Sequence, residues 1–139
     1  AQMLGTLRTL DADMQTTIIK RMKEMVPAIA KAYKAEATID IDEGYPITYN
    51  DPALTAQMLP SLQKAAGAEK VSIIKAITGA EDFSFFQKEV PGFFFFLGGM
   101  TPGETEAFPH HTPDFYIDES GMLLGVKTFI QLSLDYLNN

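Results

Sequence analysis

Cysteine and tryptophan are absent from this sequence of 139 residues, and histidine occurs only twice. Without cysteine there are no disulfides and no thiolate metal sites, so the folded state must rest on packing. The absence also leaves the redox compartment of the protein unspecified.

Positive charge and long apolar runs are also scarce. Lys and Arg number 11 against 18 Asp and Glu, which gives a net charge of -7. A nucleic-acid surface needs a basic stripe, so nucleic acid is excluded as a partner. No apolar run approaches the roughly 20 residues that cross a bilayer, and no signal peptide follows Ala1. We therefore expect a soluble, cytoplasmic protein without a membrane partner.

The chain is nevertheless apolar enough to fold. Hydrophobic residues make up 46% of it, which suits one ordinary domain or two small pieces of domains. The sequence opens at Ala1 directly into a strand-like pattern and has no initiator methionine. We therefore expect a piece of a longer polypeptide.

Residues 1–48 have the pattern of strand, helix and strand. Side chains alternate in residues 3–9 and 37–42, as is typical of strands. Between them, Asp11 is a helix-capping residue, and apolar residues then recur at steps of three and four. Pro27 predicts a kink in this helix. The order is half of a ferredoxin-like α+β sandwich, which normally needs a second half.

The pattern of residues 49–139 indicates three further helices. Asn50-Asp51-Pro52 is a helix-start signal and Gly67 a stop signal. Residues 80–90 predict a short helix that buries Phe83 and Phe86. Asp118 predicts the cap of a final helix with an apolar stripe.

Two apolar runs between these helices predict strands. Residues 71–76 and 93–97 are too short for buried helices and fit a sheet covered on both faces. The four consecutive phenylalanines of the second run indicate a core strand rather than a base-stacking platform, because no basic groove accompanies them. We predict that this second part is an α/β segment.

The two histidines, His110 and His111, lie in a long Gly- and Pro-rich stretch, residues 98–117. Long ordered loops are often functional, and a neutral imidazole is a good ligand for zinc, manganese or nickel. Adjacent side chains rarely share one metal, however, and a closed site draws three or four ligands from separated segments. The spacing leaves open whether these are metal ligands or loop and capping histidines.

Two other polar segments have both a functional and an ordinary interpretation. Glu81 and Asp82, within residues 79–83, follow a predicted buried strand, where ligands gather in α/β sheets. Acids in a first helical turn are also favoured by the helix dipole alone. Arg8 could bind a carboxylate through its guanidinium fork, or be a solvated strand residue.

The order of these segments is more specific than any one of them. They are Gly5-Thr6-Leu7-Arg8-Thr9, Gly44-Tyr45-Pro46 with Asn50-Asp51, Gly79-Ala80-Glu81-Asp82-Phe83, and His111-Thr112-Pro113 through Phe115 to Asp118-Glu119. In this order the chain resembles the C-terminal portion of the metal-dependent amidohydrolase family that contains hippurate hydrolases, N-acyl-amino-acid amidohydrolases and indoleacetyl-amino-acid hydrolases.

The resemblance implies a fold and two domain pieces. Residues 1–48 would be the second half of a lid or dimerisation domain. Residues 49–139 would be the C-terminal segment of a zinc-peptidase-like α/β catalytic domain.

The resemblance also implies roles for individual residues. His111 would be the last ligand of a centre of two divalent metal ions (zinc, manganese, nickel or cobalt), with His110 its neighbour. Gly79, Ala80 and Glu81 would shape or contact the substrate, and Arg8 is a weaker candidate for the site. The other metal ligands and the glutamate general base would lie upstream, so we expect no catalytic residue in this chain.

The activity implied for the complete enzyme is hydrolysis of N-acyl amino acids or related amides. Metal ions would lower the pKa of a bridging water and polarise the amide carbonyl, while a carboxylate moves protons. We expect the chain to be inactive alone, and to form a homo-oligomer or to associate with the missing part of the enzyme. The alternative is a non-catalytic dimerisation or interaction module whose histidine loop is structural.

Overall fold

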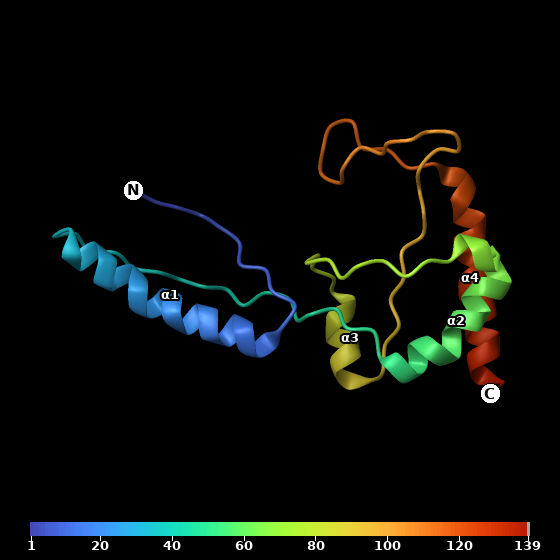
Figure 1. Cartoon of the computed structure of the whole chain (residues 1–139), viewed down its shortest axis with the longest axis horizontal. Helices are drawn as coiled ribbons and strands as arrows, with labels where there is room; N and C mark the ends of the chain where they lie inside the picture. The colour runs from blue at the N-terminus through green and yellow to red at the C-terminus, as the bar shows by residue number, and fades with distance from the viewer. Residues whose placement is uncertain (139) are drawn as a thin grey trace. The chain divides into compact units, whose positions relative to one another are not determined.

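The structure, a computed structural model, describes residues 1–138 and contains helices joined by irregular segments (Figure 1). In chain order the elements are α1 (Ala12–Ala32), α2 (Pro52–Ala66), the 3-10 turn η1 (Ala68–Lys70), α3 (Phe83–Glu89), the 3-10 turn η2 (Glu119–Gly121) and α4 (Met122–Leu137). Within residues 1–138, no helix is long and apolar enough to cross a membrane.

The chain divides into two compact units. Unit 1 contains residues 1–49 and residues 75–90, while unit 2 contains residues 50–74 and the chain from Pro91 onward. The chain therefore crosses between the units three times, since residues 75–90 belong with the N-terminal part. The boundary after residue 48 stays a prediction.

The expected strands are the main correction to the sequence analysis. Residues 3–9, 37–42, 71–76 and 93–97 contain no strand, and neither does any other part of residues 1–138. A strand is defined by hydrogen bonds to a neighbouring strand, and a period-two pattern cannot supply that neighbour. The structure therefore shows a helical chain, without the sheet of the predicted half ferredoxin-like domain or of the α/β segment.

In unit 1, helix α1 begins as its sequence predicts. The carboxylate of Asp11 accepts a hydrogen bond from the Met14 N–H at 2.6 Å, which satisfies one of the free donors of the first turn. The helix continues through Pro27 to Ala32. Ile19 is its buried residue, whereas Tyr33, after its end, is 83% exposed.

Helix α3 has a different buried face from the one predicted. Ser84 is 1% exposed, whereas Phe86 is 65% exposed. The Ser84 hydroxyl donates to the Glu81 carbonyl at 2.6 Å, so its burial is accompanied by a hydrogen bond. Sequence periodicity identifies an apolar stripe but not what lies opposite it, and for this reason the prediction for Phe86 is wrong.

Unit 2 is built on the packing of α2 against α4. Met58 and Leu62 of α2 are its buried apolar side chains, at 3% and 7% exposure. They lie beside a polar contact in which the Ser61 hydroxyl donates to Asp135 of α4 at 2.8 Å. Gly67, with φ of +95°, ends α2 in a conformation that favours glycine, as predicted.

The start of α2 is joined to the phenylalanine segment, residues 93–97. The Asn50 side chain donates to the Phe94 carbonyl at 2.7 Å and accepts from the Phe94 N–H at 2.8 Å. The Asp51 N–H donates to the Gly92 carbonyl at 3.0 Å, while its carboxylate caps α2 through the Leu54 N–H. The adjacent residues Asn50 and Asp51 thereby hold the phenylalanine segment against the start of α2.

Candidate functional site

The histidine loop, residues 98–117, is closed at its base by a main-chain hydrogen bond. The Asp118 N–H donates to the Gly99 carbonyl at 2.7 Å. A Cβ at Gly99 would lie 3.2 Å from the Ile117 side chain, so only a glycine fits here without displacement. The two ends of the loop are therefore held together.

Asp118 also joins this base to α4. Its carboxylate accepts from the Ser120 N–H at 3.1 Å and from the Ser120 hydroxyl. The hydroxyl, followed by the N–H, lowers the pKa of Asp118 below its usual range. The predicted capping role is confirmed, with the cap on η2, which leads into α4.

Inside the loop, a turn contains both histidines. The Thr112 hydroxyl donates to the Pro109 carbonyl at 2.8 Å, and the Phe115 N–H donates to the Thr112 carbonyl at 3.1 Å. The ring of His110 packs against Phe115, with centroids 4.7 Å apart. His110 is thus a packing residue of the loop, although its side chain remains exposed.

Of the two histidines, His111 has the unusual main-chain conformation. Its φ is +64°, in the left-handed region, and its side chain is exposed. This conformation costs a non-glycine residue roughly 1–2 kcal/mol, although histidine is among the types that adopt it more often. The two imidazole centroids lie 6.4 Å apart at 69°. Strained backbone at an exposed imidazole motivates a functional role for His111 rather than His110.

The described residues do not by themselves fit a divalent-metal centre. Nowhere in residues 1–138 do three His, Asp or Glu side chains come together in a group that could hold an ion. A site closed by protein needs three or four ligands, and the loop presents two imidazoles. A metal centre that includes this loop would therefore need ligands from outside the described residues.

The other predicted site residues lie together in unit 1. The Arg8 guanidinium donates to the Thr78 carbonyl at 2.8 Å, next to Gly79 and Ala80, both of which are exposed. Arg8 is thus anchored to the main chain beside this segment.

Glu81 is half-buried, and its main-chain carbonyl, not its carboxylate, holds the first turn of α3 through Ser84. Asp82, at the N-cap, makes no side-chain capping bond. The position of Asp82 at the start of α3 agrees with the interpretation as acids favoured by the helix dipole, although no capping hydrogen bond accompanies it.

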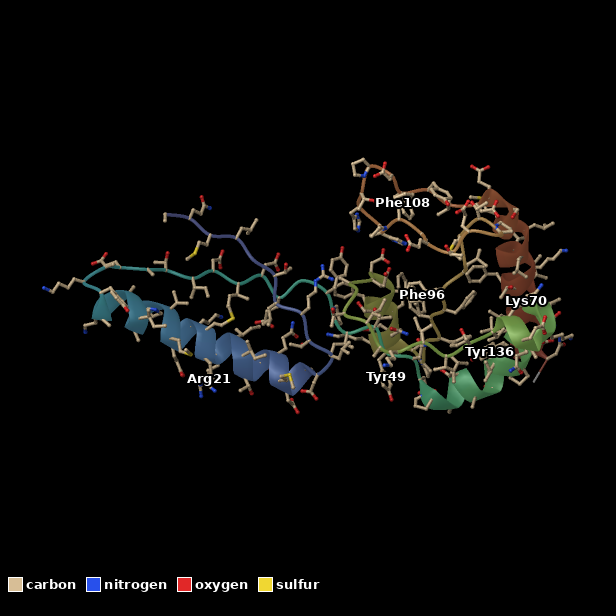
Figure 2. The ribbon with its side chains drawn as sticks, turned by 45° about the horizontal axis from the view of Figure 1, so that its top comes forward. Arg21, Tyr49, Lys70, Phe96, Phe108 and Tyr136 are labelled. Atoms are coloured by element: carbon tan, nitrogen blue, oxygen red, sulfur yellow. The ribbon has the colours of Figure 1, made fainter. Side chains whose placement is uncertain are left out.

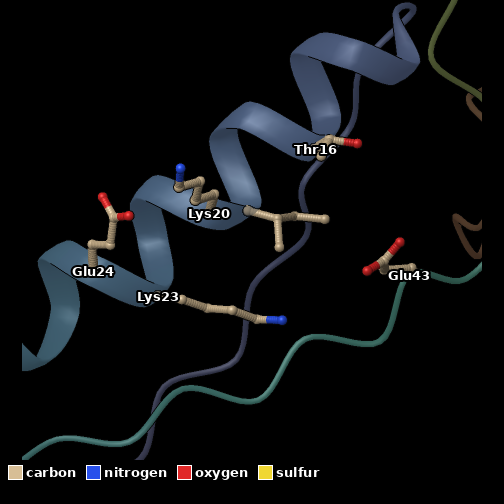
Figure 3. A pocket seen from close by; sticks show the side chains of 6 residues that line it. Thr16, Lys20, Lys23, Glu24 and Glu43 are labelled. Atoms are coloured by element: carbon tan, nitrogen blue, oxygen red, sulfur yellow. The ribbon is translucent and has the colours of Figure 1, made fainter.

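The hollow in unit 1 contains none of these residues. It has a volume of about 410 Å³ and is lined by Thr16, Ile19, Lys20, Lys23 and Glu24 of α1 and by Glu43. Lys23 and Glu43 enter it from different segments (Figure 3). Only Ile19 is apolar among its walls, so it is a solvated, charged depression rather than an enclosed substrate cavity.

Sequence reasoning missed the anchoring roles of Asn50 and of the Asp118 main chain. The sequence marks Asn50 as part of a helix-start signal and of a family-like segment, but not its side-chain bonds to a residue 44 positions away. The Asp118 N–H closes the histidine loop, and no pattern in the sequence marks such a bond. The Asn50 contact joins the start of α2 to the phenylalanine segment, and the Asp118 contact joins the two ends of the histidine loop.

Comparison with known proteins identifies a family. Peptidase family M20/M25/M40 matches residues 4–135. Thermostable carboxypeptidase 2 of Saccharolobus solfataricus is 30% identical over 139 residues, which is 99% of this chain and 35% of that protein. The N-acetyldiaminopimelate deacetylase of a Geobacillus species is 38% identical over 73% of this chain and 27% of its own length. The N-acetyldiaminopimelate deacetylase of Enterococcus faecalis is 32% identical over 91% of this chain and 32% of its own length. The chain thus spans about a third of the length of these relatives.

Proposed function

Because this chain belongs to peptidase family M20/M25/M40, we propose that it is the C-terminal part of a hydrolase that cleaves the amide bond of N-acyl amino acids or related amides. The names of two similar proteins, each an N-acetyldiaminopimelate deacetylase, support an N-acyl amino acid as the substrate class. The chain alone is proposed to be inactive, because the described residues contain no complete metal centre.

The observation that carries this proposal is the geometry of His111. The residue lies in a turn of a loop whose two ends are joined by the Gly99–Asp118 hydrogen bond, and its backbone is held in the left-handed region. An exposed imidazole on such a loop can be presented to ligands that come from another segment. We assign it as one metal ligand, with His110 as a neighbouring support.

The proposed substrate contacts are Gly79, Ala80 and Glu81, with Arg8 in a supporting position. The two small residues leave the main chain accessible, and both are exposed. Arg8 holds the carbonyl of the preceding residue, Thr78, and so orients this segment. Its guanidinium is therefore a positioning group rather than a free carboxylate receptor.

The domain assignment and cofactors complete the proposal. Residues 1–48 would be half of a lid or dimerisation domain, and residues 49–139 a segment of the catalytic domain. The complete active site would hold two divalent metal ions, which would supply Lewis-acid activation of water and carbonyl. The general base and the other ligands would come from the part of the enzyme that this chain does not span.

The test uses a fused protein in which residues 1–139 replace the matching third of thermostable carboxypeptidase 2. Metal content per chain and hydrolysis of a panel of N-acyl amino acids are measured before and after His111→Ala. We expect the substitution to lower the metal content and to reduce kcat by roughly a hundredfold or more, since losing a ligand disrupts the centre.

The matched control is His110→Ala, which removes an adjacent imidazole from the same turn. It should lower the metal content much less than His111→Ala, because it removes a neighbour of the ligand rather than the ligand itself. Unchanged metal stoichiometry and full activity after His111→Ala would refute the assignment. The same measurement on the 139-residue chain alone should show no turnover, and turnover there would contradict the proposed inactivity.

A further inference from the structure

We propose that the Thr48 hydroxyl and the Gln87 side-chain amide bind one buried water molecule, which holds helix α3 against residues 45–49. Both residues belong to unit 1. The site does not depend on the proposed function, because it concerns packing among described residues and takes no part in hydrolysis. It adds a ligand, a single neutral water, beside the helix that follows the proposed substrate contacts.

Residues 45–49 contact α3 at two places. The ring centroids of Tyr45 and Phe85 lie 5.7 Å apart, and the Tyr49 N–H donates to the Gln87 side-chain oxygen, Oε1, at 3.0 Å. Figure 2 shows Tyr49 where this segment passes α3. The Tyr49 nitrogen is bonded to the Thr48 carbonyl carbon, so the Thr48 side chain lies close to this hydrogen bond.

The bond from Tyr49 fixes the orientation of the Gln87 amide. A main-chain N–H can only donate, so the amide atom that faces Tyr49 must be the oxygen rather than the nitrogen. The nitrogen, Nε2, therefore carries its two donor hydrogens in another direction. The hydrogen-bond pattern alone thus decides which of the two similar atoms needs a further partner.

Two buried polar atoms in this region have no protein partner. Both side chains are half-buried, but the Thr48 Oγ1 and Gln87 Nε2 atoms are buried, and neither makes a hydrogen bond within residues 1–138. The two atoms therefore do not bond each other either. Burial of a polar group without a hydrogen bond destabilises the folded state, so such groups nearly always bond protein or ordered water.

The chemistry of the two groups selects water as the ligand. The amide nitrogen only donates hydrogen bonds, whereas the hydroxyl both donates and accepts. A cation does not bind beside the donor hydrogens of an amide, and neither group carries the positive charge that a buried anion requires. Water accepts from the amide and bonds the hydroxyl in either direction. Buried waters use roughly two to four polar partners, and this pair supplies two.

The remainder of a longer enzyme does not supply the partner. Both atoms are already buried by residues 1–138, so a segment that covers the outer surface of this chain does not reach them. A water molecule is small enough to be enclosed as α3 packs against residues 45–49. We therefore expect the same site in the 139-residue chain and in the fused protein described above.

The first test is Thr48→Val, followed by urea unfolding of the 139-residue chain. Valine keeps the branched shape and removes the hydroxyl, so the water loses one of its partners. We expect the equilibrium constant for unfolding to rise by roughly tenfold, the effect of one buried hydrogen bond. Thr48→Ser keeps the hydroxyl and should raise the constant much less.

The matched control is Thr38→Val, at an exposed threonine of the same unit. It should leave the unfolding constant unchanged. If the Thr48 hydroxyl bound nothing, the valine of similar shape would leave the constant unchanged or lower it, because an unsatisfied polar group would have been removed. Either of these results for Thr48→Val would overturn the proposal.

A double-mutant cycle tests whether the two side chains share the water. Gln87→Met removes the amide from a side chain of similar length. Combined with Thr48→Val, it should raise the unfolding constant by less than the product of the two single effects, by at least about twofold. Its effects should multiply with those of Thr38→Val. Effects of Thr48→Val and Gln87→Met that simply multiply would contradict a shared ligand.

A crystal structure of the 139-residue chain or of the fused protein identifies the ligand. We expect one water within about 3.2 Å of both Thr48 Oγ1 and Gln87 Nε2, and its loss in Thr48→Val. A direct bond between these two atoms, or a bond from either to another protein group, would refute the water site even if the unfolding data agree with it.

Discussion

At the scale of single residues, short polar side chains anchor the described segments to one another. Asp11, Asp51 and Asp118 cap helical turns as the sequence predicts, because each bonds an N–H only two or three positions ahead. Asn50 and Ser61 bond across 44 and 74 positions, and such partners follow only from the packing of the helices and segments. Local bonds were therefore predictable and long-range ones were not.

The contact between Ser61 and Asp135 should make stability depend on pH. The Ser61 hydroxyl, followed by Gln131 and Lys64, lowers the pKa of Asp135 in the folded chain. A carboxyl with a lowered folded pKa contributes stability above its unfolded pKa of about 3.9 and loses it as the pH falls through the folded value. Ser61→Ala should therefore move acid unfolding, followed by circular dichroism, to higher pH.

A matched control for this substitution exists on the same helix as Asp135. The Ser133 hydroxyl donates to the Phe129 carbonyl of its own helix at 2.8 Å and does not bond a carboxylate. Ser133→Ala should leave the acid midpoint unchanged. Equal midpoints for wild type and Ser61→Ala would show that the hydroxyl does not set the acid stability.

At the scale of elements, helices were predicted well and strands were not. An α-helix satisfies its main-chain hydrogen bonds within one segment, so capping residues and apolar spacing are sufficient to locate α1, α2, α3 and α4. A strand depends on a second segment, and residues 93–97 have strand-like side-chain alternation without that partner. The strand predictions are wrong for this chain because the sequence pattern of one segment does not supply the neighbouring strand.

The junction between α2 and the phenylalanine segment should depend on one side chain. Asn50→Ala removes both hydrogen bonds to Phe94, and we expect it to lower the free energy of unfolding by about 1–3 kcal/mol. Urea unfolding gives the energy, and amide exchange at Phe94 reports the local contact. Asn138→Ala removes a bond from an exposed helix end and should have little effect. Similar losses for both variants would contradict an anchoring role for Asn50.

At the scale of the whole molecule, large apolar side chains remain exposed in the described residues. In helix α4 of unit 2, Leu123 is 62% exposed and Phe129 is 63% exposed. Such surface is normally covered by another segment or chain.

This exposure predicts a shallow urea dependence of unfolding. Apolar surface that stays exposed in the folded chain does not add to the area exposed on unfolding, and the m-value scales with that area. We expect the m-value of the isolated chain to be lower than that of a compact domain of equal length, and higher in the fused protein. An m-value typical of a compact domain would show that the chain buries its apolar surface without a partner.

The sequence by itself determined the helices, their caps and the family, because these depend on local spacing and on the order of short motifs. The resemblance to metal-dependent amidohydrolases is confirmed at the level of peptidase family M20/M25/M40. The tertiary structure alone decided that Arg8 holds the carbonyl before Gly79, and that Gly99 and Asp118 close the histidine loop. These contacts join residues that are distant in the chain, and only packing brings such residues together.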